Sequence, residues 1–163
     1  MFRLYTGKSV IVISFLLSFV LAILPLGESF RYFNPEWASL VLIFWCIYLP
    51  KQFGIFTAWL IGLFMDVLMG VLLGQYALVF AFIAFMSLKL RNRLNIYPHL
   101  QQTLIIMLII AVSLMIILWI KGIQHETPDT FLFWMPALTS AIVWPFLSVI
   151  LNKFRLMYGV IEK

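Results

Sequence analysis

The chain has 163 residues, of which 64% are hydrophobic and only 10% are charged, with a net charge of +5. Ordinary soluble domains hold roughly 45 to 50% apolar and about 25% charged residues, so this composition excludes a soluble globular protein. The basic residues, which in a soluble protein would raise the question of nucleic-acid binding, lie in short segments between apolar runs, where they contact anionic lipid headgroups. We therefore predict a lipid bilayer as the surroundings and no nucleic-acid partner.

Six long apolar runs predict an all-α integral membrane protein with six transmembrane helices. The runs lack the period-two alternation of a membrane barrel, and helices satisfy their own backbone hydrogen bonds within lipid. Because six spans of about 20 residues use most of the chain, no extramembrane domain fits, and residues 1–163 form one domain. The predicted spans cover about residues 9–26, 36–49, 53–73, 75–88, 103–120 and 131–151.

The first two runs differ in length. The run 9–26 is longer than the 7 to 15 apolar residues of a signal peptide and no small-residue cleavage pattern follows it, which predicts a retained anchor. The run 36–49 is short for a span and ends at Pro50-Lys51-Gln52, where proline breaks a helix. This second run is therefore shorter than the roughly 20 residues that a full membrane crossing needs.

The segment 53–88 carries a single charge, Asp66, and must turn within the membrane. As one helix its 36 residues would measure about 54 Å, too long for a hydrocarbon core of about 30 Å. Gly70 and Gly74, with Gln75, are the residues able to make the turn. We predict one span ending near Leu73 and a second, short one from 75 to 88.

The segment 89–102 is predicted as a basic connection containing Lys89, Arg91 and Arg93. Leu90 and Leu94, which share a helical face, allow a short interfacial helix or a docking surface for a cytoplasmic partner. Attraction of this cytoplasmic basic patch to anionic lipid explains the same residues without any partner.

The last span contains Pro145 directly after Trp144. A proline within a helix removes a backbone hydrogen bond and kinks the helix. The kink serves either as a hinge or cleft, or as a fixed bend that fits the helix around its neighbours. We favour the fixed bend.

The distribution of basic residues predicts that both termini are cytoplasmic. Six spans place Arg31 and Lys121 on one side of the membrane, together with most of the acidic residues. The other side receives nine basic residues: Arg3, Lys8, Lys51, Lys89, Arg91, Arg93, Lys153, Arg155 and Lys163. Joining the third and fourth runs into one span would destroy this asymmetry, which supports the turn.

Asp66 is the one ionisable side chain within a predicted span, at a cost of roughly 2.5 to 3.5 kcal/mol on insertion scales. Gly62, Gly70 and Gly74 stand four residues before, four after and eight after it, which would place all four residues on one helical face. A smooth glycine face lets another helix approach closely, and the acid then finds a donor on that helix or on a partner subunit. The alternative is a hydrated carboxylate near the outer interface. We favour packing with a structural hydrogen bond over a catalytic or proton-relay role.

Signals for an enzyme, a cofactor or a metal are missing from the sequence. There is no phosphate-binding glycine loop with a following lysine, no HExxH and no GxSxG. Cys46 is the single cysteine, and the two histidines are predicted on opposite sides of the membrane. We predict no catalysis, no cofactor and no metal site.

Two stretches of this sequence resemble the MreD family of bacterial rod shape-determining proteins. One is FNPEWASLVLIFWCIYLP followed by WLIGLFMDVLMGVLLG, whose GxxxDxxxGxxxG run contains Gly62, Asp66, Gly70 and Gly74. The other is IVWPFL, with Trp144 and Pro145, ahead of a basic tail. With the hydropathy pattern, the resemblance spans most of the chain.

The resemblance implies an inner-membrane, non-enzymatic scaffold subunit of the complex that elongates the lateral cell wall. Such a subunit would bind MreC directly and link MreB filaments to the peptidoglycan synthases RodA and a class B penicillin-binding transpeptidase. The family is also similar in fold to the substrate-binding components of energy-coupling vitamin transporters, which makes a vitamin-binding transporter component the alternative. A ligand carrier should gather several polar groups around a concave site, and these spans offer one acid and scattered hydroxyls.

Overall fold

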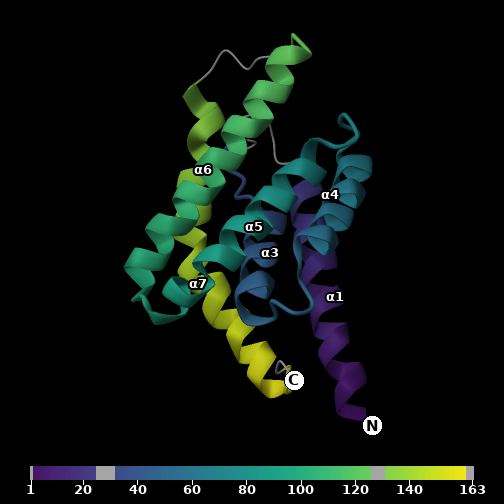
Figure 1. The fold of residues 1–163 in the computed structure, drawn as a ribbon, viewed down its shortest axis with the longest axis vertical. Helices are drawn as coiled ribbons and strands as arrows, with labels where there is room; N and C mark the ends of the chain where they lie inside the picture. Colours follow the sequence, from purple (N-terminus) through teal and green to yellow (C-terminus); the bar gives the residue numbers. More distant parts are fainter. Residues whose placement is uncertain (1, 25–31, 126–130, 161–163) are drawn as a thin grey trace.

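The structure is a computed structural model that describes residues 2–24, 32–125 and 131–160. All regular elements within these residues are helical: six α-helices, one 3-10 helix and no strand. Figure 1 shows an elongated bundle with both termini at one end, toward which the α3–α4 and α5–α6 connections also lie. The elements are α1 (Phe2–Ile23), α3 (Trp37–Tyr48), α4 (Ile55–Met69), α5 (Gln75–Ile96), α6 (His99–Ile123), η1 (Phe131–Trp134) and α7 (Met135–Met157).

Helix α3 forms the centre of the bundle. Every residue from Ala38 to Ile47 is buried, and the helix packs against α1, α5 and α7. A helix that is apolar on all sides is typical of a position enclosed by other helices. Its 12 residues measure about 18 Å, less than a hydrocarbon core of about 30 Å. The second predicted run is short because the helix is enclosed by protein.

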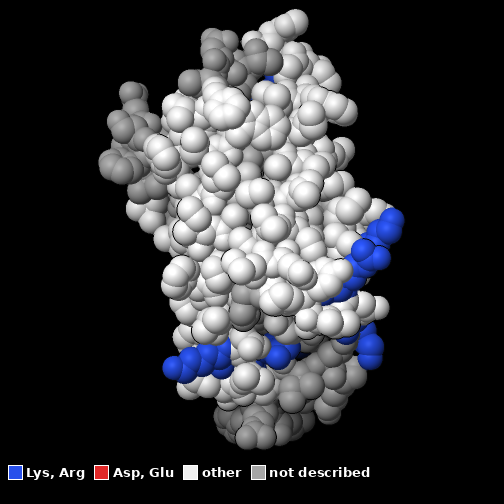
Figure 2. Space-filling view, turned by 90° about the vertical axis from the view of Figure 1, so that its left-hand side faces the viewer, with Lys and Arg blue, Asp and Glu red and all other residues white. Residues whose placement is uncertain are grey.

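The outer helices expose apolar side chains. Phe56 on α4 is 71% exposed, Leu108 on α6 is 63% exposed, and Phe146 on α7 is 69% exposed. Figure 2 shows a side of the bundle that is largely free of charge, with most of its visible Lys and Arg toward the lower end. Two helical segments, Leu100–Ile123 and Phe131–Met157, are long and apolar enough to cross a membrane. An apolar exterior of this kind is typical of a membrane protein.

The boundary between the third and fourth predicted spans requires correction. Helix α4 ends at Met69, four residues before the predicted end near Leu73, because Gly70 adopts a left-handed conformation that terminates the helix. Helix α5 begins at Gln75 and continues through the basic residues to Ile96. The predicted connection 89–102 is therefore mostly helical, and the turn between α5 and α6 lies at Tyr97 and Pro98.

The other helices extend past the apolar runs. Helix α1 begins at Phe2 within the predicted tail and ends at Ile23, and residues 25–26 of the predicted span 9–26 lie outside the described residues. Helix α6 exceeds the range 103–120 at both ends. The range 131–151 starts with the 3-10 turn η1 and its helix continues to Met157. Polar residues at these ends continue the helices, since no helix-breaking residue precedes them.

Candidate functional site

The candidate site is the junction between α4 and α5, where two glycines make the turn. Gly70 follows α4 with φ of +63°, and Gly74 precedes α5 with φ of +104°. Glycine adopts positive φ without the steric cost that other residues carry. The two helices consequently form a tight hairpin, which Figure 1 shows toward the end of the bundle opposite the termini.

Asp66 lies within this hairpin and is completely buried, with an exposed fraction of 0%. Its Oδ2 atom accepts hydrogen bonds from the backbone N–H of Gly74 at 2.9 Å and of Ala77 at 3.3 Å. Its Oδ1 atom accepts one from the backbone N–H of Tyr76 at 2.6 Å. The first N–H groups of a helix have no partner within it, and the helix dipole favours negative charge beside them. The carboxyl group of α4 therefore caps the start of α5.

Gly62 lies one turn before Asp66 and allows α4 and α5 to touch. A Cβ atom at position 62 would lie 2.5 Å from the Cα atom of Ala77 and 2.5 Å from the carbonyl oxygen of Tyr76. Real Cβ atoms do not approach backbone this closely, so any larger residue would push the two helices apart. Gly62 holds open the space in which Asp66 reaches its donors.

The glycine face predicted from the spacing is wrong for two of its members. Gly62 and Asp66 share the side of α4 that faces α5, whereas Gly70 and Gly74 lie in the turn, because the helix ends at Met69. The expected donor belongs to the neighbouring helix, and it consists of three backbone amides. A hydrated carboxylate does not agree with an exposed fraction of 0%.

Trp144 belongs to a second polar contact, which joins three helices. It is 1% exposed, and its Nε1 donates to Oε1 of Gln102 on α6 at 3.5 Å. The Nε2 atom of Gln102 donates to the backbone carbonyl of Leu94 on α5. Gln102 was missed by sequence reasoning, because a single glutamine near the end of an apolar run does not identify distant partners.

Pro145 lies inside α7, next to Trp144. The Oγ atom of Ser148 donates to the carbonyl oxygen of Pro145 at 2.9 Å, one turn along the helix. Proline cannot donate a hydrogen bond to the carbonyl four residues before it, so the ladder of α7 is interrupted at this point. Whether this interruption acts as a fixed bend stays a prediction.

Isolated serines in the apolar runs form further links that the sequence did not assign. The Nε1 atom of Trp45 on α3 donates to the Oγ atom of Ser14 on α1 at 2.9 Å. The backbone N–H of Glu36, before α3, donates to the Oγ atom of Ser140 on α7 at 2.9 Å. These bonds tie the central helix to its neighbours at both ends.

The residues of the predicted cytoplasmic basic patch, Lys89, Arg91 and Arg93, lie in the last turns of α5. The Nζ atom of Lys89 lies 5.7 Å from the centre of the Phe85 ring. Leu94, one of the leucines expected on an interfacial surface, is 0% exposed and packs into the bundle. A separate interfacial helix is therefore wrong, and a docking role of the basic side chains stays a prediction.

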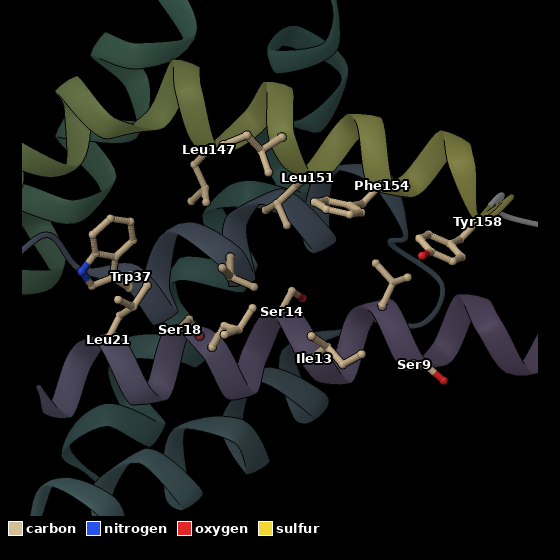
Figure 3. A pocket seen from close by; sticks show the side chains of 14 residues that line it. Ser9, Ile13, Ser14, Ser18, Leu21, Trp37, Leu147, Leu151, Phe154 and Tyr158 are labelled. Atoms are coloured by element: carbon tan, nitrogen blue, oxygen red, sulfur yellow. The ribbon is translucent and has the colours of Figure 1, made fainter.

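An apolar groove lies between α1, α3 and α7, and sequence reasoning gave no signal of it. Its volume is about 450 Å³. Figure 3 shows Leu147, Leu151 and Phe154 of α7 on one side of the groove, with Tyr158 just after that helix, and α1 with Ser14, Ser18 and Leu21 on the other. Apart from three serines, Tyr158 and the indole of Trp37, its lining side chains are purely aliphatic or phenyl groups.

No group of three His, Cys, Asp or Glu side chains that could hold a metal ion occurs among the described residues. Cys46 is buried in α3.

Comparison with known proteins assigns the chain to a family. A family model described as rod shape-determining protein MreD matches residues 4–154. The rod shape-determining protein MreD of Haemophilus influenzae is 30% identical over 147 residues, covering 86% of this chain and 87% of that protein. No solved structure matches the chain. The chain belongs to the MreD family of rod shape-determining proteins.

Proposed function

We propose that this chain is a non-enzymatic, multi-pass scaffold of the bacterial inner membrane that belongs to the complex that elongates the cell wall. It would bind an MreC-like protein directly and couple MreB filaments to the peptidoglycan synthases RodA and a class B penicillin-binding transpeptidase. Membership of the MreD family supports a role in rod shape determination. The partners and the coupling are our proposal.

The state of Asp66 carries the proposal. Both oxygens of this buried acid are engaged by backbone N–H groups of the same chain. A relay or catalytic acid needs access to a proton donor or a substrate, and it belongs to a chain of titratable groups. An acid that caps its neighbouring helix supports a protein that works through its surfaces.

The arrangement of charge supports the proposed orientation, with both termini in the cytoplasm. The termini lie at one end of the bundle in Figure 1, and most of the visible basic side chains in Figure 2 gather toward that end. Lys121 lies in the last turn of α6, toward the opposite end. Short cytoplasmic connections of membrane proteins carry an excess of Lys and Arg.

The alternative function, a vitamin-like ligand carrier, finds less support. Ligand sites combine an apolar wall with several convergent polar groups. In the groove between α1 and α7, the hydroxyls of Ser14 and Ser18 donate to their own helix, to the carbonyls of Ile11 and Phe15. A polar vitamin would find few partners there.

Co-purification with an MreC-like protein of the same bacterium tests the proposal. The tagged full-length chain is extracted in mild detergent, and an unrelated six-helix membrane protein with the same tag serves as the control. We expect the MreC-like protein to be retained by this chain and lost from the control, and depletion of the chain to turn rod-shaped cells round. A chain that purifies without the MreC-like protein, and whose depletion creates a vitamin requirement in cells that stay rods, would favour the carrier.

A further inference from the structure

We propose that the groove between α1 and α7 holds one acyl chain of an anionic phospholipid from the cytoplasmic leaflet. The inference rests on the proposed orientation of the chain in the membrane. It does not depend on binding to an MreC-like protein, so the two proposals can fail separately.

The length of the groove matches one leaflet. Figure 3 shows it running along the helices, from Leu21 and Trp37 at one end to Ser9 and Tyr158 at the other. The path along α1 from Ser9 to Leu21 measures about 18 Å. Half of a hydrocarbon core of about 30 Å is about 15 Å, so one extended acyl chain fits the groove from the interface to the middle of the membrane.

The wall of the groove suits hydrocarbon. Its volume is about 450 Å³, and even apolar cavities of about 150 Å³ stay dry and take apolar ligands. The hydroxyl of Ser14 donates to the Ile11 carbonyl at 2.7 Å, and that of Ser18 donates to the Phe15 carbonyl at 2.8 Å. Neither serine presents a free hydroxyl donor to the groove. Water therefore finds few hydrogen-bond partners there, and a lipid chain would leave neither of these hydroxyls without its partner.

The width of the groove favours a lipid chain over a partner helix. At their nearest approach some residues of α1 and α7 lie within 8 Å of one another between Cα atoms, and Trp37 and Val41 of α3 line the groove between them. A helix with its side chains is about 10 to 12 Å wide and does not fit where the two walls approach so closely. A single hydrocarbon chain is less than half as wide.

Charge at one end of the groove selects an anionic headgroup. Lys8 precedes Ser9 on α1 and is exposed, and Arg155 follows Phe154 on α7. The guanidinium carbon of Arg155 lies 4.1 Å from the centre of the Tyr48 ring, which holds this side chain near the end of the bundle where the termini lie. Basic residues at the cytoplasmic surface attract anionic lipids, so the phosphate would lie between these two helix ends.

The test measures lipid retained by the purified full-length chain. The protein is incorporated into nanodiscs containing equal amounts of phosphatidylglycerol and phosphatidylethanolamine, released into mild detergent and analysed by native mass spectrometry. We expect one phosphatidylglycerol per chain. Leu147→Trp fills the groove, and Phe146→Trp, on the adjacent exposed position of α7, is the matched control. The filling variant should retain at least about tenfold less lipid, and the control should retain as much as the unmodified chain.

A second pair of variants tests the headgroup. Lys8→Gln should remove the preference for phosphatidylglycerol, and Lys121→Gln, in the last turn of α6, should keep it. Ile13→Trp fills the groove from the α1 wall and provides an independent test in case Leu147→Trp fails to fold.

Three results would overturn the proposal. One is equal lipid retention by the filling variants and the Phe146→Trp control, which would indicate annular lipid only. Another is equal retention of the two lipids by the unmodified chain. The third is loss of a second copy or of a protein partner from the filling variants while their lipid content stays unchanged, which would assign the groove to that occupant.

Discussion

Replacement of Asp66 tests how the α4–α5 hairpin is held together. The carboxyl group accepts three backbone hydrogen bonds at the start of α5 and is 0% exposed. Asp66→Leu introduces a larger, apolar side chain and removes every acceptor, which leaves three backbone N–H groups without this partner. Each orphaned donor costs about 1 to 3 kcal/mol, so we expect the free energy of unfolding to fall by about 3 kcal/mol or more.

Asp66→Asn separates hydrogen bonding from shape. The amide keeps one oxygen, which can continue to accept from Gly74 and Ala77, and it presents an NH₂ group to the N–H of Tyr76. Because one backbone N–H group loses its acceptor, we expect the free energy of unfolding to fall by about 1 to 3 kcal/mol. The order of stability should therefore be the unmodified chain, then the asparagine variant, then the leucine variant.

Thermal unfolding of the purified chain in one detergent provides the assay, followed by circular dichroism. A loss of about 3 kcal/mol corresponds to a fall in Tm of roughly 6 to 12 °C for a chain of this size. Val67→Leu, at the adjacent position that is 67% exposed, is the control and should unfold within about 0.5 kcal/mol of the unmodified chain. If Asp66→Leu unfolds at the same temperature as Val67→Leu, the capping argument is refuted. If both Asp66 variants also leave cell shape and complex assembly intact, the junction has no functional importance.

Three further substitutions probe the packing around this junction and the link to α7. Gly62→Ala should destabilise the chain by about 1 to 3 kcal/mol in the same assay, because the added Cβ would lie 2.5 Å from the Cα of Ala77. Gly74→Ala should cost about 1 to 2 kcal/mol, since φ of +104° is strained for a residue with a Cβ, and hydrogen exchange at the start of α5 should become faster. Gln102→Leu should cost about 1 to 3 kcal/mol and make the fluorescence of Trp144 more sensitive to a membrane-soluble quencher, because the indole N–H loses its partner.

Gly54 supplies the control for both glycine substitutions. A Cβ atom at this position meets no atom within 4 Å, and its φ of −87° suits any residue. Because Gly54 is the N-cap residue of α4, where glycine is preferred to alanine, Gly54→Ala should cost roughly 0.5 to 1 kcal/mol, less than Gly62→Ala. A loss at Gly54 as large as that at Gly62 would mean that the method does not resolve close helix packing.

The turn at Gly70 and Gly74 could be predicted because the apolar segment 53–88 is too long for a single transmembrane helix. An uninterrupted helix over the apolar segment would have exceeded the membrane, and only glycine suits the two positive φ values that the structure shows. The assignment of both glycines to a helical face failed because a spacing of four residues carries meaning only while the helix continues. The spacing of Gly70 and Gly74 agrees both with one face of a continued helix and with a turn, and the tertiary contacts determine which of the two forms.

The end of α5 was misplaced for a different reason. The charges of Lys89 and Arg93 predict the start of a loop, but charge by itself does not end a helix, and both residues have good helical propensity. Pro98 disfavours a helical conformation at Tyr97 and was the stronger signal. Contacts between distant residues, such as the one from Gln102 to Trp144, depend on how the helices pack and have no local signal.

Short helices inside a membrane explain why the few buried polar groups stand where they do. Helices α3 and α4 have 12 and 15 residues, about 18 and 22 Å, so in the proposed bilayer orientation some of their ends would fall within or near the hydrocarbon region. A helix end leaves backbone groups without partners, and lipid offers none. Asp66 satisfies the start of α5, and Ser140 accepts from the N–H of Glu36 at the start of α3. These side chains are required by the architecture of broken and enclosed helices, which is why the buried carboxyl group of Asp66, engaged by backbone N–H groups, argues for a scaffold more strongly than for chemistry.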